Sequence, residues 1–361
     1  MTVGALTAEA WSSGEAARWL EARRTERGLV PLADGLVGVV SHAAAMEVLT
    51  DSRRFTSKFG TAPQRREPVG ASLNLSDPPH STRIRRSLEK PEFVASPRWA
   101  SLAEELLAAK PRDLVADFAQ PLALAVFGEL FGIDDPQALA ELGRLTRALP
   151  RAADAAAFRV ADDALLEWLR AHQGRTGAFF EAGAELSTVD QLYLQRLLAQ
   201  TGHESTAMAI ALSLELILRD GLELPDEVCR GGGAGDHLHN TLRAIDELVR
   251  VTSPLIRFAR EATEDTELGA CGTRFVVFFP LVNRDPRVFV DPQRVDFARA
   301  PNPHVAFGAG SHACFGAGIA RAVLGSALSA FARRARPKLI SSAVLKSSVT
   351  RGLDALLVAW S

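Results

Sequence analysis

The residues best suited to carry chemistry lie together in one stretch, residues 305–322, which has the sequence VAFGAGSHACFGAGIARA. It contains the pattern F-G-x-G-x-H-x-C-x-G, in which glycines surround one histidine and one cysteine. Glycine permits positive φ angles and a close approach of the backbone to a flat ligand, so that free N–H groups can point at the sulfur. The apolar segment that follows predicts a helix whose N-terminal dipole favours the ionised form of Cys314. The spacing therefore predicts a metal-bound thiolate.

Two other interpretations of Cys314 stay open at this point. A free cysteine is most often a small buried apolar residue. A zinc site made by His304, His312 and Cys314 is the second alternative, although the stretch has no C-x-x-C pair and no fourth ligand. The six fixed identities arise by chance less than about once in 10⁷ positions at average residue frequencies. This rarity favours a specific ligand-binding role for the loop.

The composition is that of a globular protein with no bias towards a charged partner. The chain has 361 residues, 47% of them hydrophobic, and a net charge of -2. It is long enough to form a substantial hydrophobic core, and it lacks the excess of positive charge that is typical of a nucleic-acid-binding protein. Its three scattered cysteines suit a reducing compartment, and no signal core or run of about 18 apolar residues is present. We expect a soluble cytoplasmic protein with no nucleic-acid or membrane partner.

Helical periodicity dominates the pattern of apolar residues. Alanine, leucine, arginine and glutamate recur at three- and four-residue spacing, as in residues 98–110, 190–220 and 240–251. Short β-rich runs occur at residues 29–41 and 273–283. Residues 229–240, CRGGGAGDHLHN, predict a loop, and no internal repeat or clean linker divides the chain. The expected fold is mainly α with a small β region, built as a single domain over residues 1–361.

The cysteine stretch resembles the haem-binding loop of the cytochromes P450, the haem-thiolate monooxygenases. The resemblance implies a haem b cofactor whose iron takes Cys314 as its axial metal ligand. A thiolate in that position pushes electron density towards bound oxygen and favours O–O cleavage. The resemblance also implies that His312 meets a haem propionate and that Phe307 packs near the sulfur, with Gly308 and Gly316 in the same cofactor-binding loop.

The segment TGHESTA, inside a long apolar helix pattern, resembles the family's distal helix motif A-G-x-E-T-T. An acid beside an alcohol is costly in such a helix unless both are used. The resemblance implies that Glu204 and Ser205, with Thr206 next to them, are catalytic residues that interrupt the helix and relay protons to oxygen. Thr201 replaces the usual alanine, and Ser205 replaces the usual threonine. The serine keeps the hydroxyl with less rotamer restriction.

The segment DPPHSTRIRR resembles the family's D-P-P-E-H-T-R-L-R-R, which contributes propionate ligands. Arg85 keeps the arginine position, whereas Ser81 stands where the propionate-binding histidine is expected and His80 replaces the glutamate. Either Ser81 makes a weaker contact or His80 reaches in from one residue earlier. Arg260 falls where a second propionate-binding arginine is expected, and Arg257 is the competing choice.

The segment AIDELVR contains Glu247 and Arg250, which share one helix face at a spacing of three. It resembles the family's structural E-x-x-R motif. The resemblance implies a buried pair that is joined by a second arginine downstream, assigned here to Arg294. These three residues are expected to be structural and not catalytic.

The chain is unusually short for the soluble bacterial members of this family, mainly between Gly132 and Gly202. A shortened lid predicts an open distal face, which suits a bulky substrate, a carrier-bound substrate or a pocket completed by another chain. The candidate pocket residues flank the proposed distal helix and the strand after the E-x-x-R motif. They are Leu198, Thr201, Leu255, Ile256 and Phe258, for each of which a purely structural core position is the alternative.

The implied function is that of a haem-dependent monooxygenase. It would insert one oxygen atom from O₂ into an organic substrate, by hydroxylation or epoxidation, in bacterial secondary metabolism. Because no flavin or iron–sulfur motif is present, electrons from NAD(P)H are expected through a separate ferredoxin reductase and ferredoxin. The expected docking contacts are Arg83, Arg86 and Lys90.

Two alternatives keep the fold and change the function. One is a haem-thiolate enzyme that couples rings, desaturates, rearranges or uses peroxide. The other is a non-catalytic module of the same fold that recruits partners to a biosynthetic complex. Substrate identity does not follow from fold and motif, because selectivity resides in loops.

Overall fold

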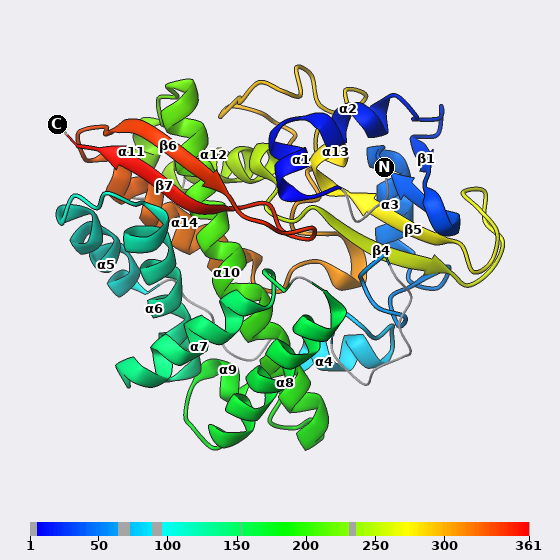
Figure 1. Cartoon of the computed structure of the whole chain (residues 1–361), viewed down its shortest axis with the longest axis horizontal. Coiled ribbons are helices and arrows are strands. Elements are labelled where there is room, and N and C mark those ends of the chain that lie inside the picture. Colours follow the sequence, from blue (N-terminus) through cyan, green and yellow to red (C-terminus); the bar gives the residue numbers. More distant parts are fainter. Residues whose placement is uncertain (1–5, 64–72, 89–95, 153, 231–235, 361) are drawn as a thin grey trace.

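The fold is organised around one long helix, α10 (Thr188–Asp220), which runs through the middle of the molecule (Figure 1). The computed structural model describes residues 6–63, 73–88, 96–152, 154–230 and 236–360. The Ser187 hydroxyl caps the start of α10 by accepting the Asp190 N–H, and Gly221 ends the helix with a φ of 63°. Apolar side chains on all sides of α10 are buried, as expected for a helix that other helices surround.

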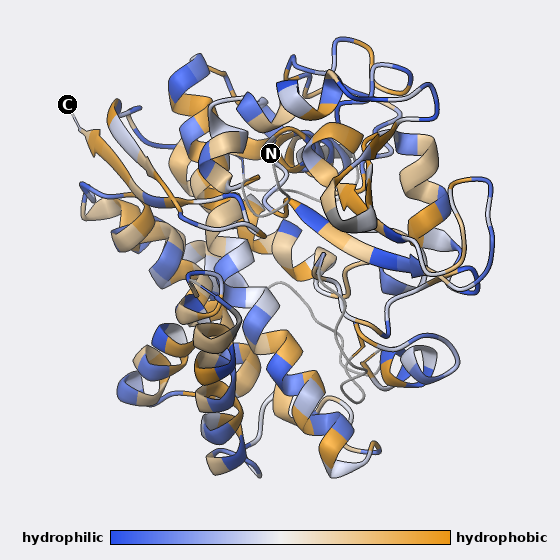
Figure 2. Cartoon of the chain, turned by 45° about the vertical axis from the view of Figure 1, so that its right-hand side comes forward, coloured by the Kyte–Doolittle hydropathy of each residue, from blue (hydrophilic) through white to orange (hydrophobic). Residues whose placement is uncertain are grey.

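Longer helices pack around α10 or against its neighbours, and three of them begin at a polar cap. Ser96 and Asp135 each cap a helix that starts with proline, and Asp154 caps the next helix along the chain. Figure 2 shows helices with hydrophobic residues on one side and hydrophilic residues on the other. These helices are α5 (Pro97–Ala108), α6 (Gln120–Phe131), α7 (Pro136–Ala148), α8 (Ala155–Ala171), α12 (Asp236–Thr252) and α14 (Ala317–Ala332).

Shorter helical elements connect and cover this body. A π-helical turn, Val115–Ala119, leads into α6, and 3₁₀ turns lie at Ala33–Gly35 and Gly310–His312. The short helices are α1 (Ala8–Ser12), α2 (Glu15–Glu21), α3 (His42–Thr50), α4 (His80–Leu88), α9 (Ala178–Glu181), α11 (Asp226–Cys229) and α13 (Phe279–Val282).

A five-stranded sheet lies beside the helical body, in the order β1-β2-β5-β4-β3. Only the β2–β5 pairing is parallel within this sheet, and β4 joins β5 in antiparallel register with Arg260 opposite Phe275. A separate antiparallel hairpin, β6–β7, packs on α10 near the C-terminus. The strands are β1 (Leu29–Pro31), β2 (Leu36–Val39), β3 (Phe55–Thr56), β4 (Arg257–Ala262), β5 (Arg274–Phe278), β6 (Lys338–Val344) and β7 (Leu353–Ala359).

Buried apolar side chains cover both faces of the larger sheet. On one face, Val276 and Phe278 pack with residues of α1 and α2. On the other face, Phe275 and Val277 pack with α3. The helical body around α10 has its own, larger apolar cluster. The expected mainly α architecture with a small β region is therefore confirmed.

Two details differ from the sequence prediction. The β-rich run of residues 273–283 ends as a strand at Phe278, because Pro280 opens the short helix α13. The predicted loop at residues 229–240 is wrong at both ends, since Cys229 ends α11 and α12 already begins at Asp236. Residues 231–235 lie outside the described residues.

Within the described ranges, no single helix is both long and apolar enough to cross a membrane. Two neighbouring helical segments reach the length and hydropathy of a membrane span only when they are taken together. They are residues 115–131 and 136–148, and the angle between them is 112°.

Candidate functional site

The cysteine loop is a tight turn that needs glycine at two positions. Gly308 and Gly310 have φ angles of 70° and 68°. A Cβ on Gly310 would lie 2.7 Å from the Leu49 carbonyl oxygen, so α3 packs directly against the loop. The Cys314 N–H closes the turn by donating to the Phe307 carbonyl at 2.7 Å. The positive φ values predicted from the glycine spacing are thus confirmed.

The Cys314 side chain is exposed to solvent at the start of α14, although protein atoms crowd it on most sides. This crowding raises the pKa of the thiol, while the Gly316 N–H and the charges of Arg85 and Arg321 oppose the rise. Metal binding is coupled to loss of the thiol proton, and the accessible surface of the sulfur is what such binding requires.

His312 belongs to a polar cluster with residues far away in the sequence. Its Nε2 atom lies 3.3 Å from the Ser57 hydroxyl and 3.8 Å from Asp77 Oδ1. Burial lowers the pKa of His312, against the effect of Asp77. Arg260, which is 2% exposed, lies within electrostatic range of both His312 and Asp77, and burial lowers its pKa to about 10. Arg260 thus remains a cation at neutral pH, and Asp77 and Ser57 are cluster members that the sequence reasoning missed.

Arg85 of α4 reaches the cysteine loop from the other side by donating to the Ala313 carbonyl. The two remaining candidates from its segment lie apart from this contact. His80 is 3.7 Å from Asp190 of α10, which Arg83 also contacts at 3.3 Å. Ser81 is 1% exposed, and its hydroxyl has no hydrogen-bond partner within the described part of the chain. His80 Nε2 has no hydrogen-bond partner within the described residues either, so the choice between His80 and Ser81 as propionate ligand stays a prediction.

The donor set around Cys314 fits a haem. The loop with the accessible sulfur also carries His312 and is bonded by Arg85, and Arg260 lies within electrostatic range of His312. Two buried nitrogens of this set, Arg85 Nε and His312 Nδ1, have no acceptor in the described residues. Such nitrogens match carboxylate groups, which haem carries as propionates. The zinc alternative is not supported. Within the described ranges, no group of three or more His, Cys, Asp or Glu side chains is placed to hold a metal ion.

The acid and the alcohol of the TGHESTA segment face different surroundings on α10. Glu204 is 2% exposed and accepts hydrogen bonds from Gln120 Nε2 at 2.8 Å and Arg151 Nη1 at 2.5 Å. Ser205 is exposed and donates to the Thr201 carbonyl one turn earlier. Because that bond stays within the helix, α10 continues without the interruption that the resemblance implies. Thr206 is buried beside them.

Two neighbours of the Glu204 region, Arg151 and Thr146, were not predicted from the sequence. Arg151 lies in the turn after α7 and also bonds Asp354 of β7 at 2.9 Å. Beside Glu204, His203 pairs with Thr146 at 2.8 Å, and burial lowers its pKa to about 3, so it is a neutral core residue. Neither Arg151 nor Thr146 stands in a recognisable motif, so only the packing of α6, α7 and α10 brings them to this position.

The E-x-x-R pair forms a buried charge network, but the predicted second arginine is wrong. Glu247 and Arg250 are both fully buried and joined by two hydrogen bonds of 2.8 Å. The second arginine on Glu247 is Arg299, whose Nε lies 3.1 Å from both carboxylate oxygens. Arg294 contributes its backbone carbonyl, while its side chain points to Asp296 at 3.6 Å and is 69% exposed. The chain turns at residues 294–299, and this turn carries the Arg294 side chain outward.

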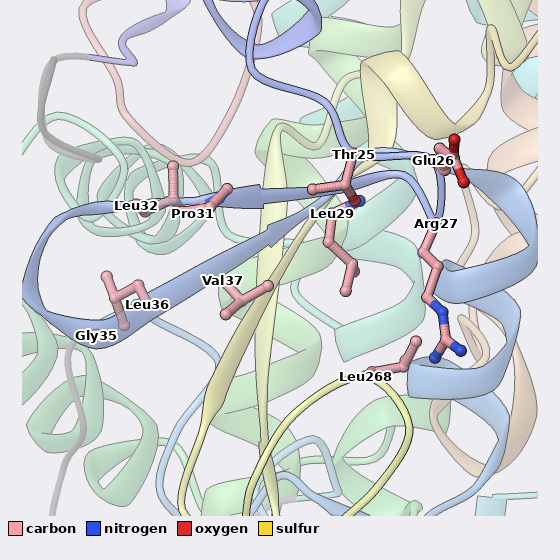
Figure 3. Close-up of a pocket in the computed structure, with 10 residues that line it drawn as sticks. All are labelled: Thr25, Glu26, Arg27, Leu29, Pro31, Leu32, Gly35, Leu36, Val37 and Leu268. Carbon is pink, nitrogen blue, oxygen red and sulfur yellow. The ribbon is translucent and has the colours of Figure 1, made fainter.

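The five candidate pocket residues belong to different apolar clusters or to the surface. Leu198 packs in the helical body, and Thr201 is exposed on α10. Ile256 is fully buried in the apolar cluster under α1 and α2, where the core interpretation holds, whereas Leu255 and Phe258 pack on the opposite cluster with α3. An open cavity of about 690 Å³ lies elsewhere, between the β1–β2 hairpin and Leu268 (Figure 3). Its mainly apolar lining includes neither Cys314 nor any of these five residues.

Comparisons with known proteins agree with this geometry. The family model for cytochrome P450 matches residues 236–352. Nocardicin C N-oxygenase from Nocardia uniformis subsp. tsuyamanensis is 32% identical, over 82% of this chain and 81% of its own length. Cytochrome P450 165B3 from Amycolatopsis orientalis is 30% identical, over 89% and 88%. The structure of P450BioI in complex with hexadec-9Z-enoic acid ligated acyl carrier protein has a TM-score of 0.79 and 20% identity, over 95% of this chain and 98% of that one.

Proposed function

This chain belongs to the cytochrome P450 family, a family of haem-thiolate oxidoreductases, and from this premise we propose that it inserts one oxygen atom from O₂ into an organic small molecule. The observation that carries the proposal is the Cys314 loop. An accessible sulfur lies near the start of a helix, close to Arg85 and two residues after His312, and Arg260 lies within electrostatic range of His312. Arg85 and His312 each have a buried nitrogen that lacks an acceptor among the described residues. Cys314 would hold the iron, and the three basic side chains would hold the propionates.

A haem bound here supplies the oxygen chemistry, for which a thiolate ligand favours O–O cleavage. The contribution of the chain's own residues is to position that group and to handle protons. The exposed Ser205 hydroxyl, already donating to Thr201, is the group we assign to proton delivery on α10. Glu204 would replenish that proton when its bond with Arg151 opens. Thr206, which is buried next to Ser205, would support the helix at this point.

Electron supply is assigned to a separate ferredoxin, reduced by NAD(P)H through a ferredoxin reductase. The exposed side chains of Arg83 and Arg86 on α4 support this assignment, because Arg85 of the same helix bonds the cysteine loop. Lys90, the third expected docking residue, lies outside the described residues.

The substrate class is assigned to bacterial secondary metabolism. The names of relatives support this assignment, among them nocardicin C N-oxygenase and pentalenic acid synthase, each 32% identical to this chain. A carrier-bound substrate is the second candidate, favoured by a structural neighbour solved with an acyl carrier protein. Product analysis separates hydroxylation from coupling, desaturation or rearrangement. Turnover with peroxide alone, without reductase, would identify a peroxide-using enzyme.

The first experiment is the absorption spectrum of the purified protein, reduced with dithionite and exposed to carbon monoxide. Wild type is compared with Cys314→Ser and with two matched controls, Cys229→Ser and Cys271→Ser, which alter the other cysteines. We expect a red-shifted Soret band of the thiolate type in wild type and both controls, and its loss in Cys314→Ser. Retention of the band in Cys314→Ser, or folded wild-type protein that takes up no haem, would contradict the proposal. Substrate-dependent consumption of NAD(P)H then separates an enzyme from a recruitment module.

A further inference from the structure

Phe307 begins the cysteine turn, and a cation lies over its ring. The guanidinium carbon of Arg321 is 4.5 Å from the centroid of the Phe307 ring. A cation within about 6 Å of an aromatic face is attracted by the ring's quadrupole. The Phe307 carbonyl also accepts the Cys314 N–H at 2.7 Å. A side chain that restrains Phe307 therefore restrains the turn that presents the sulfur.

The position of Arg321 is itself set by an acid on another helix. Arg321 Nε, on α14, donates to Asp246 Oδ1 on α12 at 2.7 Å. His304 Nε2 lies 3.4 Å from the same oxygen, and its ring is 5.9 Å from Phe307. Burial works to raise the pKa of Asp246, but the bonds from His304 and Arg321 hold it below its usual value, so the acid stays charged. Asp246 directly precedes Glu247, whose buried network fixes α12 at this point.

We propose that Arg321 is a positioning residue of the cysteine loop, which clamps Phe307 and raises the reduction potential of a haem held at Cys314. The second half of this proposal rests on the proposed function, whereas the clamp does not. The physical reason is electrostatic. Reduction adds an electron to the iron, and a nearby positive charge stabilises the more negative state. Arg321 lies close enough to Cys314 for its charge to act on the sulfur.

The clamp is tested by a double-mutant cycle in the purified whole chain, with Phe307→Leu, Arg321→Met and the double variant compared by chemical denaturation. If the ring and the cation interact as the geometry indicates, their coupling changes the unfolding equilibrium constant by about three- to fivefold. Additive effects of the two substitutions would overturn the clamp. The readout needs no haem chemistry.

The electrostatic effect is tested by the midpoint potential of the haem-loaded protein. We expect Arg321→Met to lower the potential, with a shift in the reduction equilibrium of about tenfold, equal to about 59 mV for one electron. Arg321→Lys keeps a positive charge, so it should retain most of the potential, and it should keep part of the coupling to Phe307 because an ammonium is also attracted by the ring. Arg243→Met is the matched charge-loss control. Its side chain bonds the Ala298 carbonyl, and the charges that act on Cys314 are those of Arg85 and Arg321, so the potential should move far less in this variant.

Two other outcomes have distinct meanings. If Arg321→Met slows electron delivery from ferredoxin and leaves the potential at its wild-type value, Arg321 is a docking residue and the electrostatic part of the proposal is wrong. If wild type folds and binds no haem, the proposed function fails, and so does the electrostatic effect. The double-mutant cycle still decides whether Arg321 holds Phe307.

Discussion

Arg151 and Glu204 form an ion pair, with 2.5 Å between Nη1 and Oε1, that joins the turn after α7 to the middle of α10. The same guanidinium bonds Asp354 of β7 at 2.9 Å. One arginine therefore connects the turn after α7, the proposed distal helix α10 and strand β7 of the C-terminal hairpin. Glu204 is almost fully buried, whereas Asp354 is 44% exposed. We therefore expect the bond to Glu204 to contribute more to the free energy of unfolding than the bond to Asp354.

Arg151→Met should destabilise the protein by about 2–3 kcal/mol, because it leaves the Glu204 carboxylate buried without its cation. Asp354→Asn removes the exposed partner and should cost less than about 1 kcal/mol. Chemical denaturation of the two variants measures the difference. Equal losses of unfolding free energy would show that the two carboxylates contribute alike and would contradict this account.

Ser205→Ala should separate reductant consumption from product formation. The exposed hydroxyl of Ser205 is the group assigned to proton delivery, and general acid–base groups of this kind contribute roughly 10²-fold or more to a rate. We expect a large fall in product formed per NAD(P)H oxidised, with more peroxide released. Ser205→Thr keeps the hydroxyl and is the matched control, for which coupling should persist. Unchanged coupling in Ser205→Ala would remove Ser205 from the mechanism.

Asp77 should make stability depend on pH in the acid range. Burial works to raise its pKa, but hydrogen bonds from His312, Thr56 and Ser57 outweigh burial and lower it from 3.8 to about 2. A carboxyl with a depressed pKa stabilises the fold fully above the unfolded value and loses this contribution as the pH falls from about 4 to about 2. Asp77→Asn should therefore cost about 2 kcal/mol at neutral pH.

The check on Asp77 is the denaturant midpoint of wild type and Asp77→Asn, followed from neutral pH down to pH ~3. The two curves should converge as the pH falls, because the wild-type carboxyl becomes protonated. A constant gap between them would mean that the asparagine disturbs packing and that the charge of Asp77 contributes little.

The network around Glu247 gives a paired prediction about two nearby arginines. Arg299→Met should lower stability by about 2 kcal/mol, since it removes charged hydrogen bonds to a fully buried carboxylate. Arg294→Met should change stability by no more than about 0.5 kcal/mol, because its exposed side chain makes only a 3.6 Å contact with Asp296 and the variant keeps the backbone carbonyl. Thermal unfolding of both variants tests this order, and the reverse order would contradict the assignment of Arg299.

Features that depend on local spacing follow well from the sequence. The glycine pattern of the cysteine loop predicts the positive φ angles seen at Gly308 and Gly310. Helical periodicity predicts α10, and the spacing of three predicts the pairing of Glu247 with Arg250. Each of these is governed by a few consecutive residues, whose conformational preferences act at short range.

Features that join distant segments did not follow. The choice of Arg299 over Arg294 depends on a turn whose path no motif specifies. His80 contacts Asp190 because α4 packs towards the start of α10. The five candidate pocket residues were chosen by their nearness to motifs, and packing distributes them over different apolar clusters and the surface.

By itself, the sequence determined which residues could carry chemistry or pair: a cysteine in a glycine turn, an acid beside an alcohol in a long helix, and a glutamate and an arginine on one helix face. Only the tertiary structure decided which partners these residues have. Glu204 meets Arg151 from 53 positions away, and His312 meets Ser57 from 255 positions away. The physical reason is that backbone conformation responds to neighbours in the chain, whereas a polar contact between distant segments depends on how whole helices and strands pack. That packing is set by the combined burial of many apolar side chains, which no single motif encodes.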